Sequence, residues 1–211
     1  MSQLAAYLGR YPQLRSRGGV WREIARYVQR DAPGVERVLE VGAGYCDFIN
    51  AHPARERMAF DLNPQMAAHA DPEVRFFVGD AIRLPGLVPR SVDLCFASNF
   101  LEHLELAEVA ELLARLRQVL ALGGRLILLQ PNHRLCAEHY FDDPTHKTAF
   151  DDLTIRLLLE RSGFRVVRIV PGLLPFSMKS RLPKWSWLVR AYLNSPWKPL
   201  AAQMYIVAEV T

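Results

Sequence analysis

The 211-residue sequence lacks the features that mark secreted, membrane-spanning or repetitive proteins. It has only three cysteines, Cys46, Cys95 and Cys136, whose odd number and wide spacing suit reduced thiols better than a disulfide framework or a zinc site. No apolar run reaches the roughly 20 residues that span a bilayer, and the first residues lack the charged-then-apolar order of a signal peptide. No internal repeat or low-complexity tract is present. Together these absences predict one globular domain in the cytoplasm.

The positive charge of the chain is concentrated in two segments. Residues 1–30 carry six arginines against one acid, Glu23, and residues 171–198 carry five basic residues and no acid. Each segment therefore has a net charge of +5, and since the whole chain has +4, the remainder has −6. Such segments indicate a negatively charged partner or surface, although ordinary solubilising charge explains the N-terminal one equally well.

From Glu36 onward, short β-rich runs alternate with helical patterns. Several runs are apolar at consecutive positions, as expected of strands that are covered on both faces. The clearest helix covers 104–121, where apolar residues recur every three or four positions until Gly123-Gly124 end it. This alternation predicts a parallel sheet with helices on both faces. The predicted strands are 36–41, 57–61, 74–79, 92–97, 124–130, 164–170 and 202–210.

Both ends of the chain depart from the alternation. Residues 18–34 predict an N-terminal helix that Pro33-Gly34 end. Between the last two predicted strands, prolines and a tryptophan-rich segment stand where a crossover helix would lie. We therefore predict a single domain over 1–211, with a helical cap at 1–35 and an insertion at 171–198.

The segment VLEVGAGYCDFI runs from the first predicted strand into a glycine-rich turn. Gly42 and Gly44 let the backbone turn sharply and approach a ligand closely. Glu40 would repel a pyrophosphate but attract a cationic amino group. Asp61, at the end of the next strand, suits two ribose hydroxyls, and Asp80, after the third, suits an exocyclic amine. Because loops at the strand ends of an open α/β sheet meet at one crevice, these residues predict S-adenosylmethionine as the ligand.

The chain resembles the class I S-adenosylmethionine-dependent methyltransferases over roughly 31–170 and again over 200–210. Five segments carry the resemblance in the order of the family: LEVGAGYCDF, FDLNP, VGDA, SVDLCFASNFLEHL and GGRLILLQPN. Cys46 stands where the family motif E/D-x-G-x-G-x-G has its third glycine. The resemblance implies a three-layer α/β/α sandwich with a mostly parallel seven-stranded sheet whose last strand is antiparallel, preceded by N-terminal helices.

The resemblance also implies which residues bind the cofactor. The methionine end would lie against the glycine loop, the ribose against Asp61, and the adenine against Asp80 and Ala81. Asn99 and Phe100 would line the floor near the methyl group. A helix cap or a surface carboxylate is the alternative for each acid, above all for Asp80. The predicted cofactor-binding residues are Glu40, Gly42, Ala43, Gly44, Asp61, Leu62, Asp80, Ala81, Asn99 and Phe100.

Histidines gather after the fourth and fifth predicted strands. Methyl transfer needs a nucleophile in line with the methyl group, and an oxygen nucleophile usually also needs a base. We predict His103 and His146 as catalytic residues, because His103 directly follows the fourth strand and His146 has Asp142 and Asp143 close by. Packing or the orientation of a loop is the alternative for His103. His133 and His139 are interpreted as structural or surface residues.

A metal site is a further alternative at the same place. Small-RNA 2′-O-methyltransferases and some quinone O-methyltransferases carry E-x-x-E-H after this strand, and the former add a later histidine. Glu102, His103 and His146 match three of these ligands, but Asn99 replaces the first carboxylate. Since the loss of an anionic ligand weakens a hard divalent-cation site, the sequence predicts no metal.

The predicted insertion mixes tryptophans with cations, where this fold often carries its acceptor cap. It suits a lid over a sugar or ring, a contact with an anionic membrane through 176–198, or a surface that stacks nucleic-acid bases. A dimer contact or a helix packed on the sheet edge are further alternatives.

The predicted function is O-methylation of a small molecule or of a glycan or lipid-linked intermediate. A weaker likeness to methyltransferases encoded with glycan-assembly enzymes, carried by the loop FDDPTH and the Pro- and Trp-rich tail, favours this acceptor. An RNA 2′-hydroxyl or a quinone-like phenol is the alternative acceptor. The non-enzymatic alternative is a sensor or scaffold that binds the cofactor.

Overall fold

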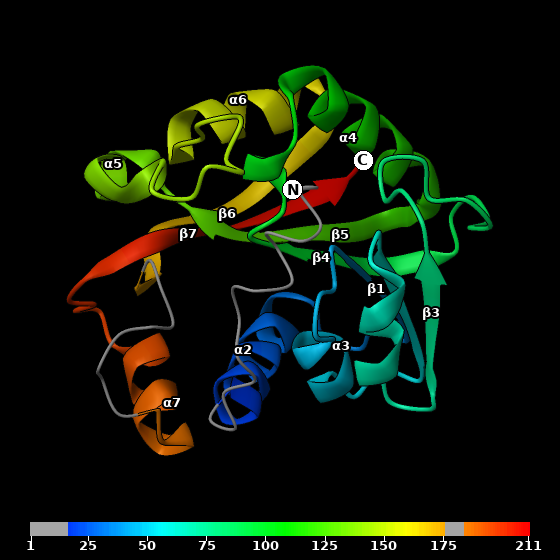
Figure 1. Ribbon diagram of the computed structural model, residues 1–211, viewed down its shortest axis with the longest axis horizontal. Helices are drawn as coiled ribbons and strands as arrows, with labels where there is room; N and C mark the ends of the chain where they lie inside the picture. Colours follow the sequence, from blue (N-terminus) through cyan, green and yellow to red (C-terminus); the bar gives the residue numbers. More distant parts are fainter. Residues whose placement is uncertain (1–16, 176–183) are drawn as a thin grey trace.

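The computed structural model describes residues 17–175 and 184–211, and within them seven strands form one sheet (Figure 1). The order is β3-β2-β1-β4-β5-β7-β6. Strands β1 to β5 are mutually parallel, and β7 runs antiparallel to its neighbours β5 and β6. The predicted fold class is confirmed. The strands are β1 Arg37–Val41, β2 Glu56–Asp61, β3 Val74–Val78, β4 Val92–Ser98, β5 Leu120–Pro131, β6 Phe164–Pro175 and β7 Ala201–Val210.

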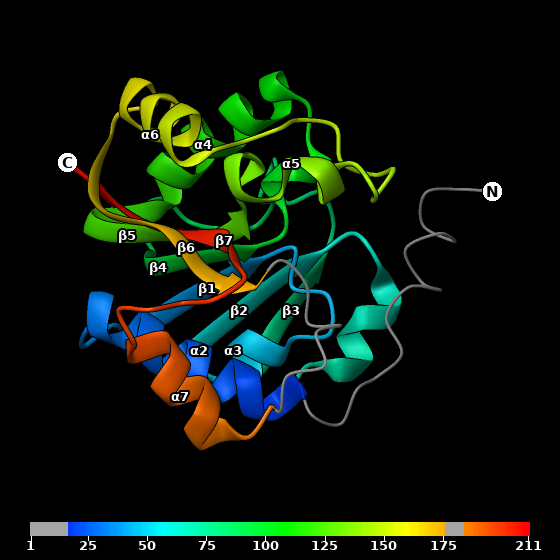
Figure 2. The same ribbon diagram turned by 90° about the vertical axis from the view of Figure 1, so that its left-hand side faces the viewer.

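Helices cover both faces of the sheet and make three layers (Figures 1 and 2). One face carries α4 (Leu106–Val119), α5 (His133–Tyr140) and α6 (Asp152–Arg161). The other carries α2 (Arg17–Asp31), α3 (Asp47–Ala51) and α7 (Ser186–Asn194). Two short 3-10 helices, η1 (Pro64–His69) and η2 (Leu101–His103), follow β2 and β4.

The strands are apolar on both faces because each face has its own core. Leu39 and Val41 of β1 pack with residues of α4 and α6, whereas Val38 packs with residues of α2 and α3. Consecutive side chains of a strand point to opposite faces, so a strand between two helical layers needs apolar residues at successive positions. This arrangement explains the unbroken apolar runs in the sequence.

The helix predicted at 104–121 ends earlier than expected, at Val119, and β5 begins at Leu120. The pairing of β5 with β4 shifts register between Val92↔Leu120 and Leu94↔Arg125, so the glycines lie in an irregularity of the strand. A β-carbon on Gly124 would lie 2.7 Å from the carbonyl oxygen of Ala121. The two glycines therefore allow a kink inside the strand and do not end the helix.

The tryptophan-rich segment begins later than predicted. Strand β6 continues to Pro175, which pairs with Ala201 of β7, so residues 171–175 belong to the sheet. Residues 176–183 of the predicted insertion, with Lys179 and Arg181, lie outside the described residues, as do residues 1–16 of the predicted cap. Within 17–175 and 184–211, no helix combines the length and apolar character needed to cross a membrane.

Helix α7 packs against the N-terminal helix α2, as both ribbon views show (Figures 1 and 2). Val20, Ile24 and Val28 of α2 are buried, as the helical pattern predicts. Glu23 of α2 is 2% exposed and accepts hydrogen bonds from Arg190 of α7 at 2.8 and 3.0 Å. Two segments far apart in the sequence, both basic, therefore lie side by side.

Candidate active site

The glycine loop after β1 has a backbone that only small residues adopt easily. Gly42 and Gly44 have φ angles of +66° and +49°, in the left-handed region. The amide of Ala43 donates to the carbonyl oxygen of Phe60 in β2 at 3.0 Å, which ties the loop to the neighbouring strand. A β-carbon on Gly42 would lie 2.3 Å from the ring of Phe100. Position 42 thus requires glycine both for its backbone and for the aromatic ring above it.

Asp61, at the end of β2, is held beside this loop by two backbone amides. Its Oδ2 accepts from Gly44 N and its Oδ1 accepts from Asn63 N, each at 2.8 Å. Burial raises the pKa of Asp61, while these two hydrogen bonds act in the opposite direction. A carboxylate oxygen can accept more than one hydrogen bond, so both oxygens retain capacity for hydroxyl donors. The carboxylate is therefore fixed in place as an acceptor for a pair of neighbouring hydroxyls.

Glu40 lies on the α3 side of β1 and not in the loop itself. It is 4% exposed, and its Oε2 accepts from the amide of Ile49 in the first turn of α3 at 3.0 Å. Burial raises the pKa of Glu40 well above its usual range, and the charges of Asp47 and Asp61 add to the effect. The carboxylate predicted to meet the amino group of the cofactor thus caps the helix that follows the glycine loop.

The predicted adenine side of the site contains one polar and two apolar residues. Asp80 Oδ1 accepts from Ile82 N at 2.9 Å and so forms the turn after β3, the alternative role weighed for this acid. Ala81 is buried. Leu62, directly after Asp61, is 69% exposed. Its side chain is therefore accessible from solvent beside Asp61.

Asn99 follows β4 in a left-handed conformation, with φ +47°. Its amide donates to Leu129 O at 2.9 Å, and its Oδ1 accepts from Gln203 Nε2 of β7 at 2.9 Å. Asn99 is therefore positioned by the neighbouring strand β5 and by β7, the strand beyond it. Gln203 was not predicted from the sequence; its only signal there is that it is one of two polar residues, with Glu209, in a mostly apolar strand.

Two residues of η2 and one residue of the loop between α5 and α6 lie close together, and the sequence singled out all three as possible metal ligands. Glu102, His103 and His146 each offer a ligand atom, and these atoms lie within 4.8 Å of one another. The rings of His103 and His146 meet edge to face, with centroids 5.0 Å apart. The backbone joins the same segments, since Lys147 N donates to Glu102 O at 2.7 Å.

Both imidazoles are oriented by backbone carbonyls. His146 Nδ1 lies 2.5 Å from Tyr140 O, which can only accept. His103 Nδ1 lies 3.3 Å from Thr145 O and 3.0 Å from Thr145 Oγ1, whose hydrogen is donated to Asp143 at 2.6 Å. Each Nδ1 is therefore the donor, and Nε2 carries the lone pair when the ring is neutral.

Glu102 is 1% exposed, and neither carboxylate oxygen has a hydrogen-bond partner among the described residues. Burial raises the pKa of Glu102 to about 8; the residue's own backbone amide acts in the opposite direction, and the charge of Asp143 adds a smaller increase. The sequence places this acid beside His103 but does not reveal its isolation. That isolation follows only from the packing of η2 beneath the 145–148 loop.

The other two loop histidines lie outside this cluster. His139 is exposed, and its Nδ1 lies 3.0 Å from Asp142 Oδ2. The ring of His133 packs edge to face against Tyr140, with centroids 5.2 Å apart. Of the four loop histidines, only His103 and His146 are thus placed together with Glu102.

Comparison with known families agrees with this geometry. Residues 39–128, which run from the glycine loop to β5, match the family model described as a methyltransferase domain. Residues 39–128 thus carry a methyltransferase domain. The sheet has the strand order of the class I Rossmann-like methyltransferase fold, and S-adenosylmethionine is the methyl donor predicted for it from the sequence. A search of curated protein sequences gave no match.

Solved structures of methyltransferases share the fold of this methyltransferase over nearly its whole length. A SAM-dependent methyltransferase of Thermotoga maritima has a TM-score of 0.73 and 18% identity, covering 99% of this chain and 96% of its own. One from Archaeoglobus fulgidus has a TM-score of 0.64 and 23% identity, covering 89% and 94%. A chain in the Haloferax volcanii complex of the Trm112 methyltransferase activator with a methyltransferase has a TM-score of 0.69 and 16% identity, covering 93% and 92%. At these identities the likeness shows the fold.

The residues of the methyltransferase fit this cofactor. Asp61, beside the glycine loop, has two carboxylate oxygens that can accept from ribose hydroxyls. The cofactor supplies a methyl group on a sulfonium. The cluster of Glu102, His103 and His146 follows β4 and β5 at the same edge of the sheet, on the side away from β2 and β3. The carboxyl edge of the sheet thus has Asp61 and the glycine loop on one side and the two imidazoles on the other.

Proposed function

We propose that this methyltransferase O-methylates a small molecule or a glycan or lipid-linked intermediate by direct in-line transfer. The observation that carries the proposal is the pair of imidazoles, His103 and His146, whose Nδ1 atoms are held by carbonyls of the chain. A hydroxyl must lose its proton as it is methylated, and a neutral imidazole with an oriented Nε2 is suited to receive it. An acceptor hydroxyl bound at this cluster would face the methyl group from the side of β4 and β5.

The cofactor contacts are part of the proposal. Asp61 would bind the ribose, and Asp80 with Leu62 and Ala81 the adenine. The backbone of Gly42, Ala43 and Gly44 would follow the methionine end, and Asn99 and Phe100 would border the methyl group. Since Glu40 caps α3, its part would be to hold the loop.

The test is transfer of a labelled methyl group from the cofactor to a panel of saccharides, phenols and RNA. We expect label on a hydroxyl oxygen of a saccharide or lipid-linked acceptor. Label on RNA or a phenol would replace this acceptor class by one of the two alternatives. Label on nitrogen would contradict O-methylation.

We further propose that the surface around α7 contacts anionic membranes. Trp185, Trp187 and Trp197 are 62, 64 and 77% exposed, and the first two rings stack with centroids 6.0 Å apart. Aromatic rings beside cations are typical of proteins that lie at a lipid interface. Lys184 and Lys198 flank these rings in sequence.

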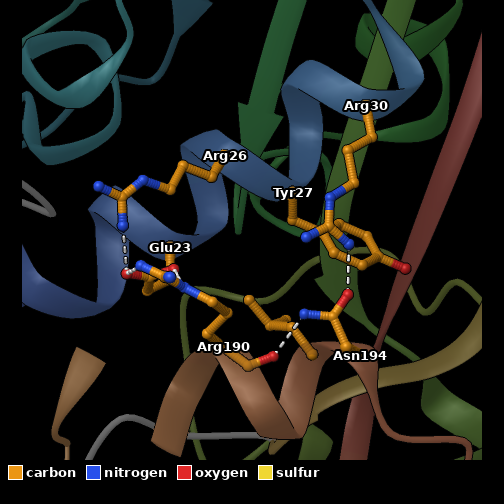
Figure 3. Close-up of a pocket in the computed structure, with 7 residues that line it drawn as sticks. Glu23, Arg26, Tyr27, Arg30, Arg190 and Asn194 are labelled. Atoms are coloured by element: carbon orange, nitrogen blue, oxygen red, sulfur yellow. Dashed lines mark hydrogen bonds and ion pairs between the residues drawn. The ribbon is translucent and has the colours of Figure 1, made fainter. Parts of the chain in front are cut away.

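The packing of α7 on α2 enlarges this basic surface. A cavity of about 230 Å³ lies between the two helices, and Figure 3 shows Arg26 of α2 and Arg190 of α7 meeting at Glu23 while Arg30 is directed at Asn194. Glu23 forms ion pairs with Arg26 and Arg190, so the cavity holds more positive than negative charge. This clustering of the two basic segments supports an anionic surface as the partner.

The three cysteines are buried free thiols, which supports the predicted cytoplasmic location.

Replacing Trp185 and Trp187 by alanine and Lys184 by glutamate is expected to abolish most binding to anionic vesicles. Each basic residue near an anionic surface contributes about 1 kcal/mol, and the rings add apolar burial. Vesicle co-sedimentation at two salt concentrations measures the effect. Arg156→Glu, on α6 at the opposite face, is the control and should bind like the native protein. Equal binding by both variants would remove this surface from membrane contact.

A further inference from the structure

The cluster formed by Glu102, His103 and His146 contains a buried carboxyl group whose oxygens lack a hydrogen-bond partner among the described residues. Glu102 is buried, yet neither of its oxygens is hydrogen-bonded to a described residue. A buried carboxyl group without a partner either keeps its proton or needs its charge compensated, because the charged form has lost its hydration. Native proteins rarely leave such a group uncompensated, and the usual compensation is a hydrogen bond, an ion pair or a metal ion.

The two imidazoles beside Glu102 are arranged as metal ligands are. In metal sites a ligating histidine usually donates its other ring N–H to a carbonyl or carboxylate, which fixes the ring and its tautomer. His103 donates to Thr145 O and His146 donates to Tyr140 O, so both rings meet this condition. Asp143 in turn holds the Thr145 hydroxyl at 2.6 Å, which adds an outer layer of support.

The distances suit one ion. The three ligand atoms lie within 4.8 Å of one another. An ion about 2.1 Å from each ligand would hold them about 3.0–3.4 Å apart, so modest rotations of the side chains suffice. His103 and His146 are only half-buried, which leaves an approach from solvent.

We propose that Glu102, His103 and His146 bind one first-row divalent cation. Two imidazole nitrogens and one carboxylate favour ions such as Mn²⁺, Co²⁺ or Zn²⁺ over Mg²⁺ and Ca²⁺, which prefer oxygen ligands. This proposal replaces the sequence-based prediction of no metal. That prediction rested on Asn99 standing in place of a carboxylate, whereas Asn99 is tied to Gln203 and the other three residues converge without it.

Three protein ligands leave coordination positions open, as in catalytic metal sites. An acceptor hydroxyl bound there would become more acidic and release its proton to solvent, because the cation stabilises the alkoxide. With the ion bound, the imidazoles hold the ion and the proton goes to solvent; an imidazole would receive the proton, as proposed above, only in the ion-free protein. This role of the ion rests on the proposed function, whereas the binding of the ion does not.

The test is calorimetric titration of the tag-free protein with Mn²⁺, Co²⁺ and Zn²⁺ separately, after removal of bound ions with a chelator. We expect one ion per chain for at least one of the three, and at least tenfold weaker binding of Mg²⁺. Glu102→Gln and His146→Ala should each weaken the binding by at least 100-fold. His139→Ala, an exposed histidine outside the cluster, should bind like the native protein, and thermal unfolding checks that each variant is folded.

Absence of one-to-one binding in the native protein would overturn the proposal, as would unchanged affinity in folded Glu102→Gln and His146→Ala. Because the titration uses neither cofactor nor acceptor, its result is separate from that of the methylation test. Methyl transfer that persists unchanged in excess chelator would likewise overturn the catalytic role of the ion while leaving O-methylation intact. Loss of transfer in chelator and its recovery with Mn²⁺, Co²⁺ or Zn²⁺ would support both.

Discussion

Replacing His103 or His146 by alanine is expected to lower turnover by about 10²–10⁴-fold while the affinity for S-adenosylhomocysteine stays near the native value. Both rings belong to the cluster with Glu102, and the cofactor loops come from β1, β2 and β3 on the other side of the crevice. Loss of one imidazole removes a group that takes the proton or binds the metal ion. In both cases the change affects activation of the methyl acceptor and not binding of the cofactor. Turnover with labelled cofactor and calorimetry with S-adenosylhomocysteine measure the two quantities.

His139→Ala is the matched control for this result. His139, in α5, is seven residues before His146 in the sequence. Its ring is exposed and pairs with Asp142 outside the cluster. Its variant should keep native turnover. If His103→Ala and His146→Ala also keep native turnover, the cluster has no part in the reaction. If both variants lose cofactor affinity in parallel with turnover, the cluster supports the cofactor side.

Asp61→Ala is expected to weaken cofactor binding by about 1.5–3 kcal/mol, or roughly 10–150-fold. The change removes the acceptor of the ribose hydroxyls and also releases Gly44 N, so the glycine loop loses one of its supports. Calorimetry with S-adenosylhomocysteine measures the loss. Turnover at saturating cofactor should fall much less, because Asp61 lies on the donor side of the crevice.

Asp151→Ala is the matched control for Asp61→Ala. Asp151 also accepts hydrogen bonds from two backbone amides, Leu153 N and Thr154 N, but it caps α6, which lies on the face of the sheet opposite α3 (Figure 1). Loss of such a cap destabilises the fold by about 1 kcal/mol and should leave cofactor affinity unchanged. Equal affinities in the native protein and Asp61→Ala would exclude Asp61 from the cofactor site.

The donor half of the crevice was largely predictable from the sequence. Each of its parts follows a strand directly, so the order of strands and the residue after each one are enough to place them. Asp61 is the last residue of β2, and Asp80 follows β3 with one residue, Gly79, between them, as the strand patterns predict. Parallel strands bring their carboxyl ends to one edge, and this geometry needs no knowledge of side-chain packing.

Side-chain direction within this half was decided only by the tertiary structure. Glu40 is one residue from the end of β1. Because side chains of a strand alternate between its two faces, Glu40 points toward α3 and accepts a hydrogen bond from Ile49 N. Phe100 covers Gly42 because η2 folds back over the loop. Neither contact has a signature in the spacing of residues.

The acceptor half was decided by long-range packing. His146 reaches Glu102 and His103 through a loop between α5 and α6, and no periodicity relates these segments. The burial of Glu102 without a partner, and the docking of α7 on α2 through Glu23 and Arg190, likewise depend on how separate elements meet. Local sequence determines strands, turns and the residues at their ends, because these depend on neighbours along the chain. Contacts between distant segments depend on the packing of the whole domain, and only the folded structure reveals them.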